Sequence, residues 1–496
     1  MLSSCKEEGT YPNKNISIDD FRELRESRYK LNSHRVRRYI SRLMRNDSVA
    51  FSMDSKVRAY YNAESPFVWI SRLGVLGRAD TLLSFLQSSD TLGLSPRKFQ
   101  VEQIASDIRK LRTLDLVEGK DDINLLMARV EYNLTRAYFR YAAGLEYGFV
   151  NPDWLYNRLE KYMVDSATVR FRRLSDLRPL RPDGRFYSRI LGIAFGDSIS
   201  QYLSSLHTEG NLYRRLSGLL AQGKLSRADR IRVLCNMERC RWKYRKVARL
   251  GGERKYVVVN IPSYSLIANG KEGWQYMRVG CGTLDHKTPL LVSRIERMEI
   301  NPQWIVPKSI AVGLVGRIGY MREMGMFVHD KQLGKLPPED ATYAKVVSGD
   351  QYIIQAGGPK NSLGRVIFRF DNNFSVFLHD TSSPWIFKKA MRAVSHGCVR
   401  VERPLDLALF LTSGDGNVGS RIRSLMSIDY DENLDPEEAD GQQRTYPLSY
   451  ISLKETVPLY ITYFTVFYNK EGGLSFFNDV YGYDEALAMA LSPVMP

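Results

Sequence analysis

The sequence predicts an α+β protein whose N-terminal half is helical and whose C-terminal half is mainly β. Up to about residue 250, apolar residues recur at three- and four-residue spacing, which is typical of amphipathic helices. Beyond residue 255 the apolar runs become rich in β-branched residues and are separated by Pro, Gly and Asn. The 496 residues, 44% hydrophobic and 25% charged, can fill more than one domain with sizeable cores.

The helical half is expected to cover residues 21–250, after a tether at residues 1–20 that is rich in Gly, Pro, Asn and Ser. Ser95, Asn151 and Ser226 are candidate helix starts, because their side-chain oxygens can accept backbone N–H groups. An Arg- and Pro-rich stretch is the expected internal linker, at 166–188. The clearest helical patterns lie at 78–87, 102–112, 124–145 and 226–247.

The β half is expected to comprise a domain at 251–425 and a C-terminal segment, 426–496, that packs on the preceding domains. A helix is expected at 403–413. The most apolar stretch, 450–468, contains two charged residues and a proline and is typical of strands. The sequence therefore has no run of roughly 18 apolar residues that could span a membrane. Other strand patterns lie at 255–268, 277–282, 290–300, 353–355, 364–370, 374–379 and 474–477.

The chain carries a formal net charge of +16, from 71 Lys and Arg against 55 Asp and Glu. Such a balance suits nucleic acid, a polyanionic envelope or an anionic lipid surface. The basic residues are densest at 21–46, where they follow a helical pattern that is typical of a solvated amphipathic face. Because no zinc-finger, helix-turn-helix or RNA-binding motif accompanies them, we expect no nucleic-acid partner.

The five cysteines, Cys5, Cys235, Cys240, Cys281 and Cys398, are odd in number and irregularly spaced, so no disulfide framework is expected. Cys235 and Cys240 fall on different faces of an expected helix, which argues against a bridge between them. The chain has six histidines, and they complete no metal-ligand pattern with these cysteines. We therefore expect neither a metal nor another cofactor.

The most chemically informative pattern is HDTSSPWIFKKAMRAVSHGCVR at 379–400. A thiol is a strong nucleophile as thiolate, and an imidazole such as that of His379 can take the proton of Cys398. Gly397 allows a sharp turn whose backbone N–H groups can face a developing oxyanion. The alternatives are a buried structural cysteine and a core histidine. The occurrence of both Cys398 and His379 together with the glycine turn favours acyl transfer over these alternatives.

This segment resembles the catalytic motif of the L,D-transpeptidases, the YkuD-type domain, and the chain resembles the long, scaffold-bearing YcbB-like subgroup of that family. The resemblance implies a helical scaffold domain at 21–250 and a catalytic domain at 251–425 with a lid insertion at about 312–348. It rests on NMERCRW (236–242), VVVNIPSYSL (257–266), TPLLVSRI (288–295), NPQWIVPKSIA (301–311), GGPKNSLGRVIFRF (357–370), FLHDT (377–381) and SHGCVRVERP (395–404).

The resemblance also implies a role for each residue of the motif. Cys398 would be the nucleophile, His379 the general base, and Asp380 its orienting partner through the backbone carbonyl rather than the carboxylate. Backbone N–H groups around Gly397 and Cys398 would form the oxyanion hole. Arg400 would either bind a substrate carboxylate or form a structural ion pair. Four more residues are expected to shape the turn or line the substrate site: Ser395, His396, Asn361 and Gly364.

The implied partners are peptidoglycan stem peptides, and the implied inhibitors are carbapenem β-lactams. Cys398 would form a thioester from a stem tetrapeptide, and an amine of a neighbouring stem would resolve it as a 3→3 cross-link. The same nucleophile would serve an L,D-carboxypeptidase or a transferase to another amine. A non-catalytic envelope scaffold is the remaining alternative. The Gly and Met content of 312–348 fits a mobile cover or a packed insertion, and no peptidoglycan-binding module is recognisable at 155–235.

Leu2-Ser3-Ser4-Cys5 resembles the lipobox at which bacterial lipoproteins are cleaved and lipidated on the cysteine. The basic and apolar regions that normally precede a lipobox do not precede this one. A lipid on Cys5 would anchor the protein to an envelope membrane without a transmembrane helix. We therefore expect a periplasmic cell-envelope protein that is anchored to the outer membrane.

Overall fold

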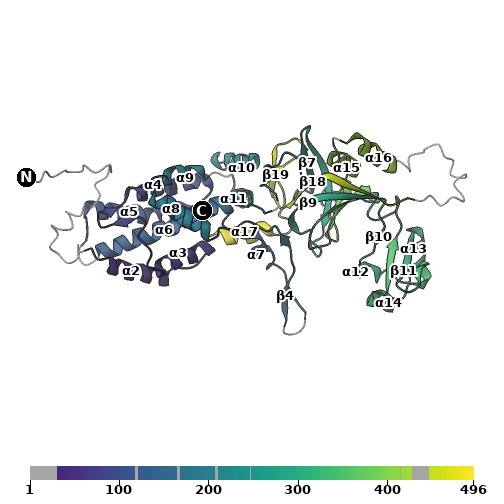
Figure 1. Cartoon of the computed structure of the whole chain (residues 1–496), viewed down its shortest axis with the longest axis horizontal. Coiled ribbons are helices and arrows are strands. Elements are labelled where there is room, and N and C mark those ends of the chain that lie inside the picture. The colour runs from purple at the N-terminus through teal and green to yellow at the C-terminus, as the bar shows by residue number, and fades with distance from the viewer. Residues whose placement is uncertain are drawn as a thin grey trace, which may run out of the picture. The chain divides into compact units, whose positions relative to one another are not determined.

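The computed structural model describes residues 31–117, 121–164, 168–206, 210–245, 247–413, 415–426 and 446–496. Two compact units divide the chain: a first unit drawn from 1–155, 179–243 and 484–496, and a second drawn from 156–178 and 244–483. The first is helical and the second mainly β, which confirms the predicted fold class (Figure 1). The expected tether at 1–20, with Cys5, lies outside the described residues.

The first unit is built around α6 (Ile123–Tyr147), a 25-residue helix that is buried along most of its length. Because its buried side chains, among them the polar Glu131 and Arg140, lie on nearly every face, neighbouring helices can pack all around it. Its neighbours include α2 (Ser33–Asn46), α3 (Ser52–Asn62) and α5 (Val101–Thr113). The remaining elements are β1 (Ile70–Ser71), β2 (Gly74–Val75), α4 (Gly77–Gln87), η2 (Ser89–Leu92), η3 (Pro96–Phe99), α8 (Gly184–Phe195), α9 (Ile199–Ser205), α10 (Asn211–Ala221), α11 (Arg227–Arg241) and, from residue 484 on, α17 (Tyr483–Leu491).

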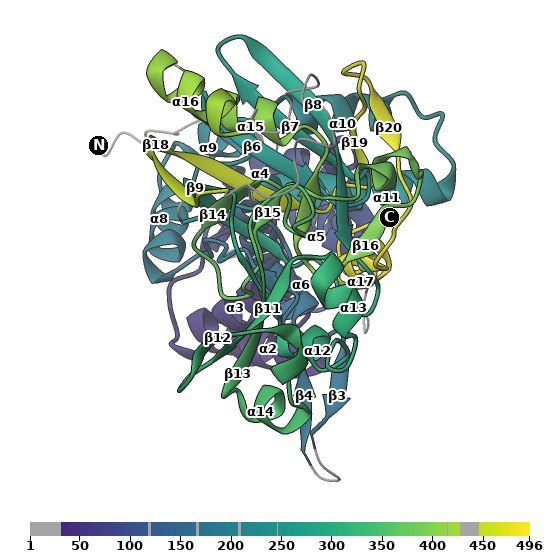
Figure 2. The same ribbon diagram turned by 90° about the vertical axis from the view of Figure 1, so that its right-hand side faces the viewer.

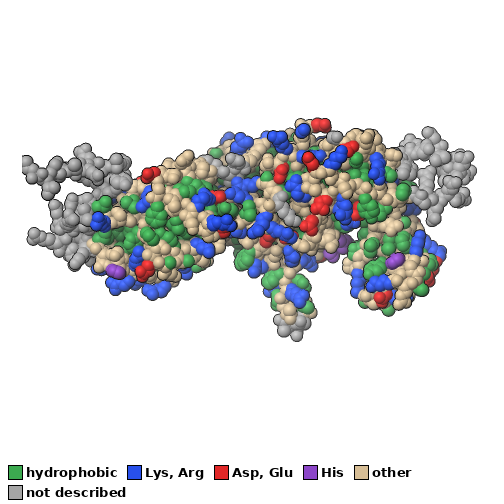
Figure 3. All heavy atoms as spheres, viewed as in Figure 1, with side chains coloured by type: hydrophobic (Ala, Val, Ile, Leu, Met, Phe, Trp, Pro, Cys, Tyr) green, Lys and Arg blue, Asp and Glu red, His purple; other side chains and the backbone are tan. Residues whose placement is uncertain are grey.

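Residues 33–46 of the basic stretch near the N-terminus form α2, with the charges outside. Val36, Ile40 and Met44 are buried, while Arg35 lies at the surface and pairs with Asp122 at 2.6 Å. The helix is therefore amphipathic, as its periodicity predicts. On the face drawn in Figure 3, Lys and Arg side chains are interspersed with acidic ones in both units. None of the helices in the described parts of the chain has the length and apolar character needed to cross a bilayer.

The second unit is organised around a ten-stranded sheet in the order β14-β15-β17-β8-β7-β6-β18-β9-β5, with β16 paired to β8. Because β14 also pairs with β9, the strand path closes on itself as a barrel-like sheet (Figure 2). The expected helix at 403–413 is α15 (Pro404–Leu411), which α16 (Gly416–Met426) follows. The strands are β5 (Ser175–Asp176), β6 (Tyr256–Asn260), β7 (Ser265–Gly270), β8 (Gly273–Gly282), β9 (Leu290–Ile300), β14 (Val366–Phe370), β15 (Leu378–His379), β16 (Ala393–Ser395), β17 (Val399–Val401) and β18 (Ser449–Thr462).

The C-terminal segment contributes more to this sheet than the sequence indicated. β18 pairs in parallel with β6 and antiparallel with β9, so it is an inner strand of the sheet and not an appendage to it. The hairpin of β19 (Val466–Tyr468) and β20 (Leu474–Phe476) follows. Periodicity shows that a segment is extended but not which strands flank it.

Residues 156–178 also belong to the second unit, although the sequence placed them in the helical domain and its linker. After α7 (Pro152–Tyr156), β3 (Lys161–Met163) and β4 (Val169–Phe171) form a hairpin, and β5 joins the main sheet beside β9. The packing units therefore do not divide the chain at residue 250, and the domain boundaries expected at 21–250 and 251–425 stay a prediction. Strands of two or three residues carry too little alternation to be recognised in a sequence.

The expected lid at 312–348 lies inside a larger insertion, 304–355, with a four-stranded sheet in the order β10-β13-β11-β12. Its methionines Met321 and Met326 are buried in a core that belongs to the insertion itself, so the segment is packed. That it covers Cys398 stays a prediction. The elements are β10 (Trp304–Ile305), α12 (Lys308–Ala311), α13 (Ile318–Glu323), β11 (Met326–Asp330), β12 (Gly334–Leu336), η4 (Pro338–Asp340), α14 (Tyr343–Ser348) and β13 (Gln351–Gln355).

Candidate functional site

The candidate site forms where β15 and β17 pair in parallel. Leu378 lies opposite Val399 and His379 opposite Arg400, and the Val399 N–H donates to the Phe377 carbonyl at 3.0 Å. Cys398, directly before β17, therefore stands beside Phe377. The rings of Phe377 and His379 lie 5.7 Å apart on one face of β15, as alternate residues of a strand should. The pairing brings the two halves of the predicted motif to one place on the sheet.

The turn that carries the cysteine is held by side chains. Ser395 Oγ donates to the Cys398 carbonyl at 2.5 Å and accepts the Gly397 N–H at 3.1 Å. Gly397 has φ +110°, a conformation that residues with a side chain rarely adopt. Ser395 is buried and bonds within the turn, whereas His396 is exposed and lies next to His286, with ring centroids 4.5 Å apart and the rings tilted by 45°. Because the Gly397 N–H is already bonded, the Cys398 N–H is the better candidate for an oxyanion donor.

Tyr481 supports the same turn, and sequence reasoning missed it. Its hydroxyl donates to the Gly282 carbonyl at 2.7 Å and accepts the Thr288 N–H at 3.2 Å. Thr288 Oγ1 in turn donates to the Gly397 carbonyl at 2.9 Å. A tyrosine nearly two hundred positions from Thr288 gives no sequence signal for this contact, which exists because β18 brings the C-terminal region into the domain.

His379 is buried, with 4% of its surface exposed. Burial and the nearby Arg400 charge lower its pKa to about 4, while the backbones of Asp380 and Leu363 act in the opposite direction. The imidazole is therefore neutral at physiological pH. Its Nδ1 is buried and has no hydrogen-bond partner among the described residues. A neutral imidazole with an unpartnered nitrogen can accept a proton.

Burial raises the pKa of the Cys398 thiol, and the Phe377 backbone, Arg369 and Arg400 only partly offset this effect. The thiol is therefore protonated at neutral pH and needs a base before it can attack. Burial lowers the pKa of Arg400, whose Nε has no hydrogen-bond partner within the described residues. No described carboxylate forms an ion pair with Arg400, so the structural ion pair considered above is not formed in the described part of the chain.

Asp380 is more than a backbone partner of His379. Its carboxylate accepts the N–H groups of Arg365 and Thr381, each at 2.7 Å. Gly364 lies directly against it: a Cβ at this glycine would come within 2.3 Å of Asp380 Cγ, and its φ is +66°. The Asp380 side chain, which we expected to matter less than its carbonyl, thus ties the residue after His379 to the 361–365 turn.

Asn361, which is expected to line the substrate site, lies in the 361–365 turn. It is 1% exposed, and its Nδ2 donates to the carbonyls of Pro302 and Ala356 at 3.0 and 2.8 Å. Its Oδ1 accepts the Leu363 N–H at 2.8 Å. Asn361 therefore organises the turn that holds Leu363 next to His379, and its place in the substrate site stays a prediction. The role of Leu363 was missed because it acts through its backbone, and the side-chain type of a residue gives no information about such a role.

Within the described residues, no group of three or more His, Cys, Asp or Glu side chains could hold a metal ion. The cysteines described, Cys235, Cys240, Cys281 and Cys398, are all free thiols. The chemistry that these residues themselves offer is nucleophilic, with a partly buried thiol, a neutral base and a guanidinium that forms no ion pair with the described residues.

Comparisons with known proteins match two parts of the chain separately. A family model described as the L,D-transpeptidase catalytic domain matches residues 254–422, and one described as a scaffold domain matches residues 55–220. A Haemophilus influenzae protein named "Putative L,D-transpeptidase" is 24% identical over 328 residues, which are 62% of this chain and 60% of that protein. The crystal structure of L,D-transpeptidase 3 from Mycobacterium tuberculosis is 14% identical, over 30% of this chain and 52% of that chain, with a TM-score of 0.18. The chain thus spans less than two thirds of the length of either protein.

We expect Gly364→Ala to disturb this site more than an equivalent change elsewhere. The added methyl group would force Asp380 away and would strain a left-handed backbone, which together should lower the free energy of unfolding by about 2–4 kcal/mol. Chemical denaturation measures this loss. NMR titration of the His379 ring should also show its pKa moving toward the ordinary value.

Gly334→Ala is the matched control, because Gly334 has φ +76° but no atom within 4 Å of an added Cβ. It should lose only the strain energy, about 1–2 kcal/mol, and leave the His379 titration unchanged. Equal effects of the two variants on both measurements would show that the contact with Asp380 is unimportant.

Proposed function

The chain contains an L,D-transpeptidase catalytic domain and a scaffold domain, and we propose that it cross-links peptidoglycan through a thioester on Cys398. The observation that carries this proposal is the buried His379, whose Nδ1 has no hydrogen-bond partner among the described residues, on the strand that pairs beside the Cys398 turn. Burial lowers its pKa and so keeps the imidazole neutral. A base in this state and position can take the thiol proton as attack occurs. The non-catalytic scaffold alternative has no such support.

In the first step, His379 accepts the Cys398 proton while Sγ attacks the carbonyl between the third residue and the D-Ala of a stem tetrapeptide. The Cys398 N–H donates to the resulting oxyanion. The carbonyl carbon then re-forms its double bond to oxygen, and the bond to D-Ala breaks. The imidazolium of His379 gives its proton to the departing amine. D-Ala leaves, and the acyl group stays on Cys398 as a thioester.

In the second step, the amine of a neighbouring stem attacks the thioester and gives a proton to His379. The thiolate leaves and takes this proton back, which restores the thiol and completes a 3→3 cross-link. The carbonyls of Leu363 and Asp380 interact with the imidazole and can fix the tautomer in which one nitrogen remains free for these transfers. Arg400, which has no described carboxylate partner, would bind the terminal carboxylate of the donor stem.

Turnover of a purified disaccharide-tetrapeptide tests this function. We expect liquid chromatography with mass spectrometry to detect free D-Ala and a dimer linked between two third residues, and Cys398→Ala to produce neither. Release of D-Ala with only tripeptide monomers would instead identify an L,D-carboxypeptidase. An active Cys398→Ala variant would rule out the proposed nucleophile.

Carbapenems should acylate Cys398 at a rate that His379 controls. Below a pKa of about 4 the imidazole is protonated and cannot accept the thiol proton. The rate of adduct formation, followed by intact-protein mass spectrometry, should therefore be level between pH 6 and pH 8. It should fall about tenfold per pH unit below the His379 pKa.

Circular dichroism at each pH verifies that the protein stays folded, and Cys398→Ala should gain no adduct. A rate that falls with a midpoint near pH 6.5, the ordinary value for histidine, would contradict the neutral buried base.

L,D-transpeptidases are generally cell-envelope enzymes, and we propose that a lipid on Cys5 anchors this one to the outer membrane. The support is the Leu2–Cys5 tetrapeptide, which lies outside the described residues. Palmitate labelling of the full-length precursor in cells should be lost in Cys5→Ala and kept in Cys240→Ala. Labelling that persists in Cys5→Ala would refute the anchor.

A further inference from the structure

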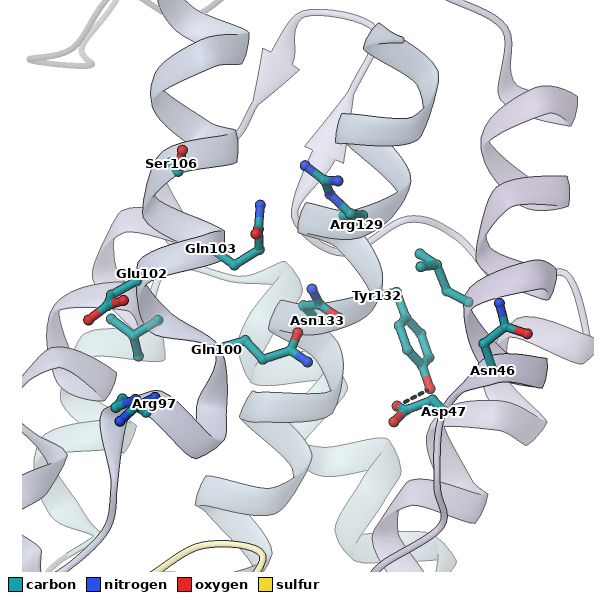
Figure 4. A pocket seen from close by; sticks show the side chains of 12 residues that line it. Asn46, Asp47, Arg97, Gln100, Glu102, Gln103, Ser106, Arg129, Tyr132 and Asn133 are labelled. Carbon is teal, nitrogen blue, oxygen red and sulfur yellow. Dashed lines mark hydrogen bonds between the residues drawn. The ribbon is translucent and has the colours of Figure 1, made fainter. Parts of the chain in front are cut away.

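We propose that the first unit carries a binding pocket for an uncharged glycan. The pocket lies between the end of α2, the start of α5 and the middle of α6, and its volume is about 670 Å³ (Figure 4). Sites for small ligands fall between about 300 and 1,000 Å³, so this one could hold a short oligosaccharide. It lies in a different unit from Cys398 and plays no part in the chemistry described above.

Three amide side chains reach this pocket without an internal partner. Asn46 comes from the last residue of α2, Gln100 precedes α5, and Asn133 lies on α6. Among the described residues, none of these side chains has a hydrogen-bond partner. Figure 4 shows the Gln100 side chain extending toward the helix that carries Asn133. Each amide offers two donors and an acceptor, the mixture that sugar hydroxyl and N-acetyl groups require.

The backbone of Gln100 is strained at this position. Its φ is +58°, in the left-handed region between η3 and α5. A glycine would adopt this conformation without the penalty of about 1–2 kcal/mol that a residue with a side chain bears. Strained residues of this kind concentrate at binding and catalytic sites. The glutamine therefore places an amide in the pocket at the expense of local stability.

Two of the charged side chains in the pocket walls, Arg129 and Asp47, are neutralised by partners within the protein, and the other two, Arg97 and Glu102, are of opposite sign. Arg129 pairs with the buried Asp107, with Nε and Oδ2 2.8 Å apart, and Gln103 Nε2 donates to the same carboxylate at 2.9 Å. On the other wall, Asp47 accepts the Tyr132 hydroxyl at 3.1 Å and pairs with Arg136 at 2.7 Å. Rigid walls with balanced charges favour an uncharged polar ligand over an ionic one.

A saccharide fits these walls better than a peptide does. Peptides bind by adding a strand to a sheet edge, or by placing the apolar face of a helix or apolar side chains in a hydrophobic groove, and here the walls are helical and mainly polar. Leu43 and Val101 are the two aliphatic residues among the twelve that line the pocket. The saccharide class follows from the pocket. The choice of a β-1,4-linked N-acetylhexosamine, of the kind found in the strands that carry stem peptides, rests on the proposed function.

The test is calorimetric titration of the full-length Cys398→Ala protein with chitotetraose, so that binding is measured in the absence of catalysis. We expect saturable binding, weakened at least tenfold in the added double substitution Gln100→Ala/Asn133→Ala. Cellotetraose, which lacks the N-acetyl groups, should bind more weakly. Gln87→Ala, an exposed amide at the end of α4, is the matched control and should bind chitotetraose unchanged. Circular dichroism checks that each variant is folded.

Three results would overturn the proposal: no chitotetraose binding, equal binding by the double variant, or binding of a stem tetrapeptide that the double substitution abolishes. The last would identify a peptide site. Since the assay uses a protein without its nucleophile, failure of cross-linking activity and failure of glycan binding are separate outcomes.

Discussion

The candidate site depends on the parallel pairing of β15 (Leu378–His379) with β17 (Val399–Val401). A parallel pair needs a crossover connection, and here the crossover is the segment between the base and the nucleophile. The buried Arg392 anchors that segment, since its Nε donates to the Val279 carbonyl and its Nη2 to the Tyr264 carbonyl, each at 3.1 Å. The spacing between His379 and Cys398 in the sequence is thus set by the length of this crossover segment.

Burial gives the site its electrostatic character. It lowers the pKa of His379 and raises that of Cys398, so both groups are uncharged before substrate arrives. A preformed thiolate–imidazolium pair would need stabilisation that this surrounding does not provide. In the proposed reaction, proton transfer then accompanies attack, and the backbone donor of the turn faces the developing charge. A thiol that remains protonated also resists oxidation better than a stable thiolate.

The sequence predicted best those features that depend on residues close to one another in the chain. His379, Gly397 and Cys398 lie in one segment, and the long helices have a period that needs no tertiary context. Contacts between distant segments could not be predicted. Tyr481 reaches the catalytic turn because β18 is an inner strand, and Leu363 acts through its backbone. A buried amide that organises a turn, as Asn361 does, and one that binds a ligand look alike in sequence.

The position of β18 also sets an order of assembly. Because β18 lies between β6 and β9, the barrel-like sheet cannot close until residues 449–462 have left the ribosome, and the Tyr481 hydroxyl arrives later still. A nascent chain that already carries Cys398 therefore lacks the framework that aligns it. Premature termination or C-terminal proteolysis would remove β18 and the support that Tyr481 gives to the Cys398 turn. An incomplete chain would therefore be inactive and would not catalyse an altered reaction.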